Sequence, residues 1–140
     1  MNIQKLTFAA IASFIVMFGL GGAWHMAIMQ DWYMAHVGLA GNTGRPEPIL
    51  WCIMLGTFMV AFIMSLIYPR FAESNKVMGG IKFGLLMGFM AFVPLEVILY
   101  GATTIFSKSI VIMDAAFQTV NGALGGIVIA FIYGDSAVKK

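Results

Sequence analysis

The chain has 140 residues, of which 61% are hydrophobic and only 10% are charged, and its formal net charge is +2. A mean hydropathy of +0.93 excludes a soluble globular domain, because such domains carry far more charged and polar residues. The small net charge gives no support to a nucleic-acid partner, so the lipid bilayer is the expected environment.

Four apolar stretches dominate the chain, at about residues 6–26, 49–69, 80–106 and 109–134. At about 1.5 Å per residue, each helix is long enough to cross about 30 Å of hydrocarbon. We therefore predict an all-α fold, a four-helix transmembrane bundle that forms one integral membrane domain over residues 1–140. The first stretch lacks a clear A-x-A cleavage site, which favours a retained helix over a signal peptide.

An aromatic cluster follows the first stretch, with Trp24, Trp32 and Tyr33 interleaved with His25 and His36. Amphipathic aromatic side chains are typical of the membrane–water interface. The beginning of the loop 27–48 is therefore predicted to lie along the outer membrane surface, before its glycine- and proline-rich part returns to the membrane.

Small residues mark the third and fourth stretches as packing helices. Glycines recur at intervals of four, and such stripes let the backbone of a neighbouring helix approach closely in lipid. The predicted packing glycines are Gly80, Gly84, Gly88, Gly122 and Gly126.

Two carboxylates lie inside the apolar stretches, Glu96 in the third and Asp114 in the fourth. Ionisable side chains at such depth are costly unless they are paired or hydrated, so each marks a candidate functional site. Pro94 removes a helical hydrogen bond close to Glu96. Asp114 is followed by Gln118 and Asn121 at i+4 and i+7, which places all three on one helix face.

A turn of few residues near Ser107 makes the third and fourth helices antiparallel neighbours. If the turn centres there, Tyr100 lies opposite Asp114, Glu96 lies opposite Gln118, and Gly88 is level with Gly126. His25 would cap this ladder from the outer end of the first helix. The predicted polar intramembrane site is Glu96, Asp114, Gln118, Asn121, Tyr100 and His25.

The ends of the second and fourth stretches resemble each other, IMSLIY at 63–68 and VIAFIY at 128–133. This similarity raises the alternative that the bundle consists of two repeated helical hairpins.

No cofactor can be named from the sequence. His25, His36, Glu96 and Asp114 are candidate metal ligands, yet no pair has a diagnostic spacing. The two histidines are also haem candidates. The chain carries no nucleophile elbow, phosphate loop or CxxC motif, so we expect no catalytic residue and no enzymatic activity of these kinds.

Lysine and arginine placement predicts the orientation, because cytoplasmic loops are enriched in these residues. One side of the predicted topology has only Arg45 and Lys108. The other side has Lys5, Arg70, Lys76, Lys82, Lys139 and Lys140. We therefore expect a multi-pass protein of the cell inner membrane with both termini in the cytoplasm.

A set of residues at and after the end of the first stretch, and in the third and fourth stretches, also matches a known pattern. In these residues the chain resembles a family of small bacterial four-span membrane proteins that is defined only as a domain of unknown function. The resemblance implies the four-helix topology and draws attention to Glu96 and Asp114, although an Asp is expected where this chain has Glu96. The matching residues are Trp24, Trp32, Tyr33, His36, Gly38, Gly84, Gly88, Ile112, Met113, Asp114 and Tyr133.

Two functions remain open at this point. The glycine stripes and the shortage of chain outside the membrane favour a protein that acts by association, as a homo-oligomer or as an accessory subunit of a larger membrane complex. The alternative is a ligand-binding or transport protein for a proton, metal, haem or small molecule, which would use the polar intramembrane site.

Overall fold

The computed structural model describes residues 2–73 and 75–134, and this part of the chain is helical with no strand. Lys139 and Lys140, which contributed to the predicted orientation, lie outside the described residues. Five α-helices and two other helical turns follow one another along the chain. They are α1 (Ile3–Ala23), η1 (Trp24–Ile28, a π-helical turn), α2 (Gln30–Ala35), α3 (Leu50–Ile67), η2 (Tyr68–Arg70, a 3-10 turn), α4 (Lys76–Ala102) and α5 (Lys108–Tyr133).

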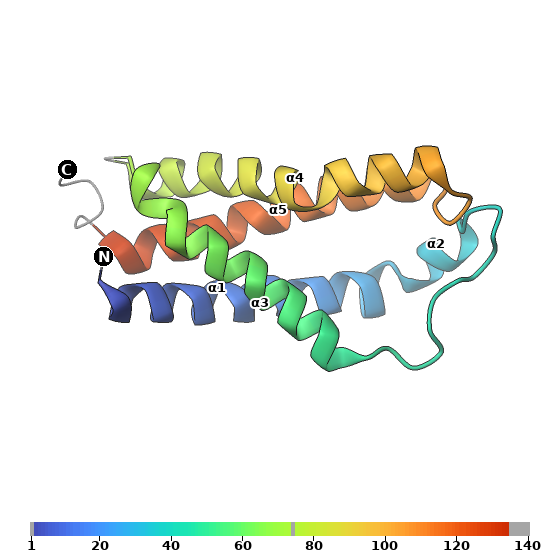
Figure 1. The fold of residues 1–140 in the computed structure, drawn as a ribbon, viewed down its shortest axis with the longest axis horizontal. Coiled ribbons are helices and arrows are strands. Elements are labelled where there is room, and N and C mark those ends of the chain that lie inside the picture. Colours follow the sequence, from blue (N-terminus) through green and yellow to red (C-terminus); the bar gives the residue numbers. More distant parts are fainter. Residues whose placement is uncertain (1, 74, 135–140) are drawn as a thin grey trace.

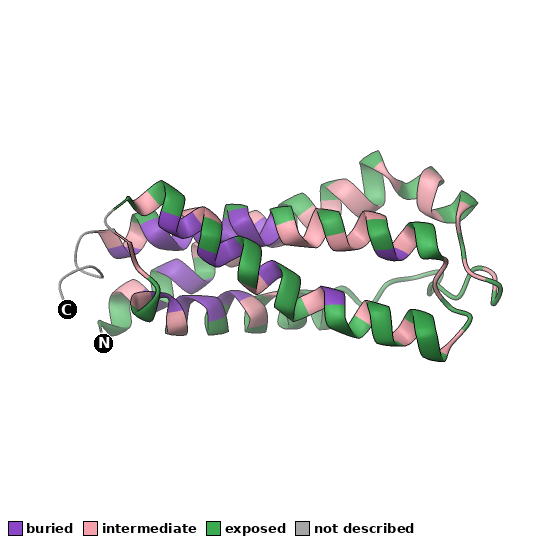
Figure 2. Ribbon diagram, turned by 90° about the horizontal axis from the view of Figure 1, so that it is seen from above, coloured by how far each residue is buried: buried purple, intermediate pink, exposed green. Residues whose placement is uncertain are grey.

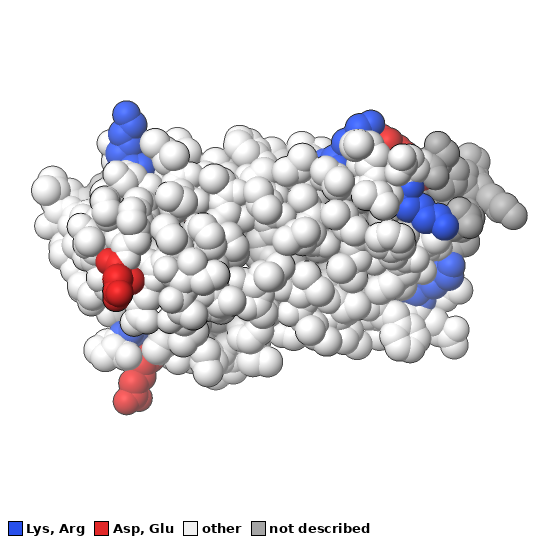
Figure 3. Space-filling view, turned by 180° about the vertical axis from the view of Figure 1, so that it is seen from behind, with Lys and Arg blue, Asp and Glu red and all other residues white. Residues whose placement is uncertain are grey.

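Four continuous helical segments are long and apolar enough to cross a membrane, which confirms the predicted all-α four-helix bundle of a multi-pass membrane protein. On the face that Figure 3 shows, Lys, Arg, Asp and Glu side chains gather toward the two ends, with a broad uncharged region between them. The spans are Ile3–Ile28, Leu50–Arg70, Lys76–Ala102 and Lys108–Tyr133.

The long axis of the bundle has two different ends (Figure 1). At the termini end lie the start of α1, the connection from α3 to α4 and the end of α5. At the loop end lie α2, the 36–49 segment and the turn between α4 and α5. The 36–49 segment is attached to that turn, because the Ala40 amide donates to Thr104 O at 3.0 Å and a Cβ on Gly38 would collide with the Thr104 carbonyl.

The predicted packing glycines form the contact between α4 and α5. A Cβ on Gly84 would lie 2.6 Å from the Ala123 Cα, and one on Gly122 would lie 2.6 Å from the Gly88 Cα. Gly80 and Gly126 approach each other in the same way. The two backbones therefore touch with no side chain between them, which is the closest packing that helices in lipid can reach.

The register of this contact differs from the prediction by one helical turn. Gly88 lies against Gln118 and Gly122, whereas it was expected beside Gly126. The cause is the turn: α4 ends at Ala102 because Thr103 is extended, with φ −140° and ψ 171°, and the Ser107 side chain caps the start of α5. The predicted third span, which extended to about residue 106, was too long, and the prediction placed the turn too close to α5.

The buried core lies toward the termini end (Figure 2). Met17, Met64, Tyr68, Phe83 and Ile129 belong to one cluster of buried side chains drawn from all four spans and η2. Toward the loop end α3 diverges from the other helices, as Figure 1 shows. The bundle is therefore closed at one end and open at the other.

The two helical hairpins pack differently. α4 and α5 run side by side along their length, whereas α3 crosses α1 and diverges from it (Figure 1). The tyrosines that end the two similar sequence segments, Tyr68 and Tyr133, are both buried and contact each other with ring centroids 5.7 Å apart. The similar segments thus meet in the core at the termini end.

Replacing Tyr133 with phenylalanine should lower the free energy of unfolding by about 1 kcal/mol, the typical net contribution of one buried hydrogen bond. The Tyr133 hydroxyl donates to Ser65 O at 2.8 Å and joins α5 to α3. Denaturation of the detergent-solubilised protein measures the loss. Tyr100→Phe is the matched control, because Tyr100 is 43% exposed and its variant should keep the wild-type stability.

Candidate functional site

Asp114 on α5 is the centre of a polar cluster at the loop half of the bundle. Its Oδ1 accepts a hydrogen bond from the Tyr33 hydroxyl at 2.9 Å, and the His25 Nε2 lies 3.4 Å from the same oxygen. The Gln118 amide approaches Asp114 Oδ2 at 3.5 Å. Side chains from η1, α2 and α5 therefore converge on one carboxylate.

The π-helical turn η1 brings two consecutive side chains of the first span to α5. The Trp24 ring stacks on Phe117 with centroids 4.7 Å apart and an angle of 6°, while His25 packs edge-on against the same ring. Trp24 Nε1 also donates to the Tyr33 hydroxyl at 3.2 Å. Wider π-helical turns are rare and frequently occur at functional sites, because they redirect side chains within a continuous helix.

Tyr33 donates to Asp114 from outside the membrane-spanning segments, in the short helix α2. Burial raises the pKa of Tyr33 well above its ordinary value, and the neighbouring Asp114 carboxylate acts in the same direction. The phenol therefore stays protonated at any physiological pH. It remains a hydrogen-bond donor to Asp114.

The one-turn correction of the register changes the partner of Glu96. The register places Glu96 level with Asp114 across the α4–α5 contact, and not with Gln118 as predicted. Glu96 Oε2 is buried and has no hydrogen-bond donor among the described residues.

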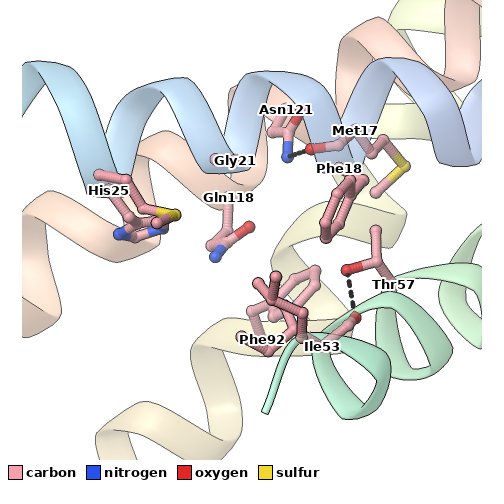
Figure 4. A pocket seen from close by; sticks show the side chains of 12 residues that line it. Met17, Phe18, Gly21, His25, Ile53, Thr57, Phe92, Gln118 and Asn121 are labelled. Carbon is pink, nitrogen blue, oxygen red and sulfur yellow. Dashed lines mark hydrogen bonds between the residues drawn. The ribbon is translucent and has the colours of Figure 1, made fainter. Parts of the chain in front are cut away.

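A cavity of about 310 Å³ lies beside the polar cluster, between α1, α3, α4 and α5 (Figure 4). Its walls are mainly apolar, and α3 contributes a wall because it diverges from the bundle at this level. Polar side chains enter the cavity wall from η1, α3 and α5. The lining residues are Met17, Phe18, Gly21, Gly22, His25, Met26, Leu50, Ile53, Thr57, Phe92, Gln118 and Asn121.

Asn121 forms the deepest polar part of this wall and is only 4% exposed. Its amide nitrogen donates to Met17 O at 3.1 Å, which joins α5 to α1. Its Oδ1 is buried and has no hydrogen-bond donor among the described residues. A buried unpaired acceptor costs free energy, so Asn121 stabilises the α1–α5 contact less than a fully bonded amide would.

The structure places the remaining predicted site residues elsewhere. Tyr100, expected opposite Asp114, is 43% exposed and lies one turn of α4 closer to the loop end than Glu96. His36 stacks on the Trp32 ring at 4.2 Å, and its Nδ1 lies 2.8 Å from Trp32 O. Among the described residues no group of three or more His, Cys, Asp or Glu side chains is arranged to hold a metal ion.

Sequence patterns assigned Trp24 and Tyr33 to an interfacial aromatic belt and did not include them in the site. The spacing of nine residues between them follows no helical period, since a π-helical turn and a break at Met29 separate them. Phe117 was missed for another reason, because apolar side chains on a membrane helix carry no distinguishing signal. The proximity of Tyr33 to Asp114 arises only when α2 folds back against α5.

Comparisons with protein-family models, with curated proteins and with solved structures gave no match.

Proposed function

We propose that this protein binds a small amphipathic molecule in the cavity between its four spans, next to the polar cluster around Asp114. The observation that carries the proposal is the convergence of polar side chains from η1, α3 and α5 on the wall of an apolar cavity. Binding sites for small molecules typically combine mostly apolar walls with a few oriented polar groups, as this cavity does.

The position of the cavity favours binding over passage through the membrane. Its deepest wall is formed by Met17 and Asn121, and beyond them lies the packed core of Met64, Tyr68 and Ile129. A molecule that enters from the loop half would therefore stop at this core. The open side beside α3 supplies an entrance from the lipid or from the loop end.

Association with other membrane subunits, or with itself, is the second function that the sequence favours. Its main support was the set of glycine stripes, and these glycines are occupied by the contact between α4 and α5 of the same chain. The glycine stripes are therefore explained without a helix from another subunit. For this reason we place ligand binding ahead of association, and we propose no catalytic role.

For the orientation, we propose that the termini end faces the cytoplasm and that the protein resides in the cell inner membrane. The support is the excess of lysine and arginine on the segments at that end. In this orientation the cavity and the carboxyl pair lie in the outer half of the membrane.

Native mass spectrometry of the protein released from its own membranes tests the binding function. We expect a noncovalent adduct on the wild type that disappears in Gly21→Leu, because Gly21 lines the cavity and a larger side chain there would fill it. Gly19→Leu is the matched control: a Cβ added to either glycine would have no neighbouring atom within 4 Å, but Gly19 does not line the cavity. An adduct that is absent, or equally present on both variants, would contradict the proposal.

A further inference from the structure

The cavity between the four spans has no lysine, arginine, aspartate or glutamate among the described residues that line it. His25 is the one lining side chain that can carry a charge. It faces Asp114 Oδ1 at 3.4 Å, so a positive charge on His25 would be neutralised within the protein. A charged molecule at membrane depth needs a partner of opposite sign. The lining therefore favours an electrically neutral ligand.

Gln118 on α5 offers an acceptor oxygen to this cavity. Its amide nitrogen is the end that approaches Asp114, at 3.5 Å from Oδ2, because an amide nitrogen donates and a carboxylate oxygen accepts. The Gln118 carbonyl oxygen consequently points away from Asp114, and in Figure 4 it lies on the side of Phe18. No described residue donates a hydrogen bond to this oxygen. It is therefore available to a donor in the cavity.

Thr57 on α3 offers a second acceptor oxygen. Its hydroxyl proton is used within the helix, since Thr57 Oγ1 donates to Ile53 O at 3.0 Å. A hydroxyl has one proton and two lone pairs, so the same oxygen can still accept a hydrogen bond. In Figure 4 this oxygen lies between Ile53 and Phe18. Asn121 adds no further acceptor to the cavity surface, because its Oδ1 is buried.

The remaining walls are apolar and suit a molecule with one aromatic ring. Phe18 from α1 and Phe92 from α4 both line the cavity (Figure 4). Aromatic rings attract each other in edge-to-face and offset-stacked arrangements. Because an apolar cavity of about 150 Å³ is enough to hold benzene, a cavity of about 310 Å³ has room for a ring with a short alkyl chain.

We infer that the cavity binds a neutral lipophilic phenol, whose hydroxyl donates a hydrogen bond to Gln118 Oε1 or Thr57 Oγ1. The inference rests on the proposed function, since it names the chemical class of the ligand in the same cavity. His25 supports the same class, because a proton on the Nε2 that faces Asp114 leaves Nδ1 of a neutral imidazole as an acceptor. A ligand with acceptors alone, such as an ether, would leave these groups unpaired, which costs free energy away from water.

Isothermal titration calorimetry of the full chain in nanodiscs, corrected for partitioning into protein-free nanodiscs, tests this class with three probes of similar size. 4-Propylphenol carries the hydroxyl donor, and 4-propyltoluene has a methyl group in its place. Phenyltrimethylammonium carries a permanent charge. We expect the phenol to bind at least about tenfold more tightly than either of the other two probes, because one hydrogen bond to an otherwise unpaired acceptor corresponds to about that factor.

Variants of the two acceptors locate the hydrogen bond. The double variant Gln118→Leu with Thr57→Val should lose the preference for the phenol but keep the affinity for 4-propyltoluene, which shows that the cavity is intact. Thr119→Val is the matched control and should behave as the wild type. Thr119 Oγ1 donates to Ala115 O at 2.7 Å, the same bond within a helix that Thr57 makes, but Thr119 does not line the cavity. Gly21→Leu, which fills the cavity, should abolish the binding of both probes.

The possible results distinguish this inference from the proposed function. Equal affinity for the phenol and 4-propyltoluene would overturn the hydroxyl class while leaving the cavity as a binding site, and a cation that binds as tightly as the phenol would overturn the neutral class. A preference for the phenol that survives in the double variant would overturn the role of the two acceptors. If no probe binds but the native adduct is present, the inference fails and the proposed function stands. If the adduct is also absent, both fail.

Discussion

Gly84→Ala is expected to destabilise the protein by about 3 kcal/mol, because overpacking a tightly packed contact costs about 1–3 kcal/mol and occasionally more. The added methyl group would lie 2.6 Å from the Ala123 Cα and still closer to the Gly122 carbonyl oxygen. Both neighbours are backbone atoms and cannot rotate away as a side chain could. The α4 and α5 helices must therefore separate along the contact that holds the Glu96–Asp114 pair.

Thermal or denaturant unfolding in detergent measures this loss, and the same substitution at Gly101 is the control. Gly101 lies on the same helix α4, but a Cβ added there would have no neighbouring atom within 4 Å. Gly101→Ala should keep the stability or raise it by up to about 1 kcal/mol, because alanine has the higher helix propensity. Equal effects of the two substitutions would refute the close α4–α5 contact.

Asp114→Ala is expected to release the short helix α2 from the bundle. The substitution removes the acceptor of the Tyr33 hydroxyl and the partner of His25. Hydrogen bonds to a charged group contribute about 1.5–3 kcal/mol. A loss of about 2 kcal/mol corresponds to roughly 30-fold faster amide exchange in α2, since about 1.4 kcal/mol is a factor of ten.

Hydrogen–deuterium exchange of residues 30–35 is the direct measurement for this second prediction. Asp31→Ala changes an exposed carboxylate within α2 itself and should leave the exchange rates unchanged. Tyr33→Phe keeps the aromatic ring and should reproduce much of the Asp114→Ala effect. Wild-type exchange rates in both Asp114→Ala and Tyr33→Phe would show that the Tyr33–Asp114 hydrogen bond does not hold α2.

Glu96 and Asp114 show which features of the site could be predicted from the sequence and which could not. Their depth in the membrane follows from the lengths of the apolar stretches, and it identified Glu96 and Asp114 as the residues to explain. The residues that lie opposite them could not be predicted from the sequence, because pairing across an antiparallel hairpin depends on where the turn is centred. When the centre of the turn moves by two residues, the residue opposite any given position on α4 changes by four, which is about one helical turn. Asp114, and not Gln118, therefore lies opposite Glu96.

Asn121 shows the same limit for a residue that the helical pattern placed on the correct face. Its spacing from Asp114 and Gln118 predicted one polar face of α5, and all three side chains do take part in interhelical or cluster contacts. Helical spacing could not predict that Asn121 bonds to the backbone of α1, or that its oxygen is buried without a donor among the described residues. Those features depend on how α1 and α3 cross.

The sequence by itself determined the four spans and the all-α class, because the bilayer requires long apolar helices whose backbone groups bond internally. It also determined which glycines pack, since four-residue spacing places small side chains on one helix face. Only the tertiary structure decided that the carboxyls face each other, that Tyr33 reaches Asp114, and that a cavity opens beside them. These contacts depend on turn length, a π-helical turn and the divergence of α3, which are non-local and leave no periodic trace in an apolar sequence.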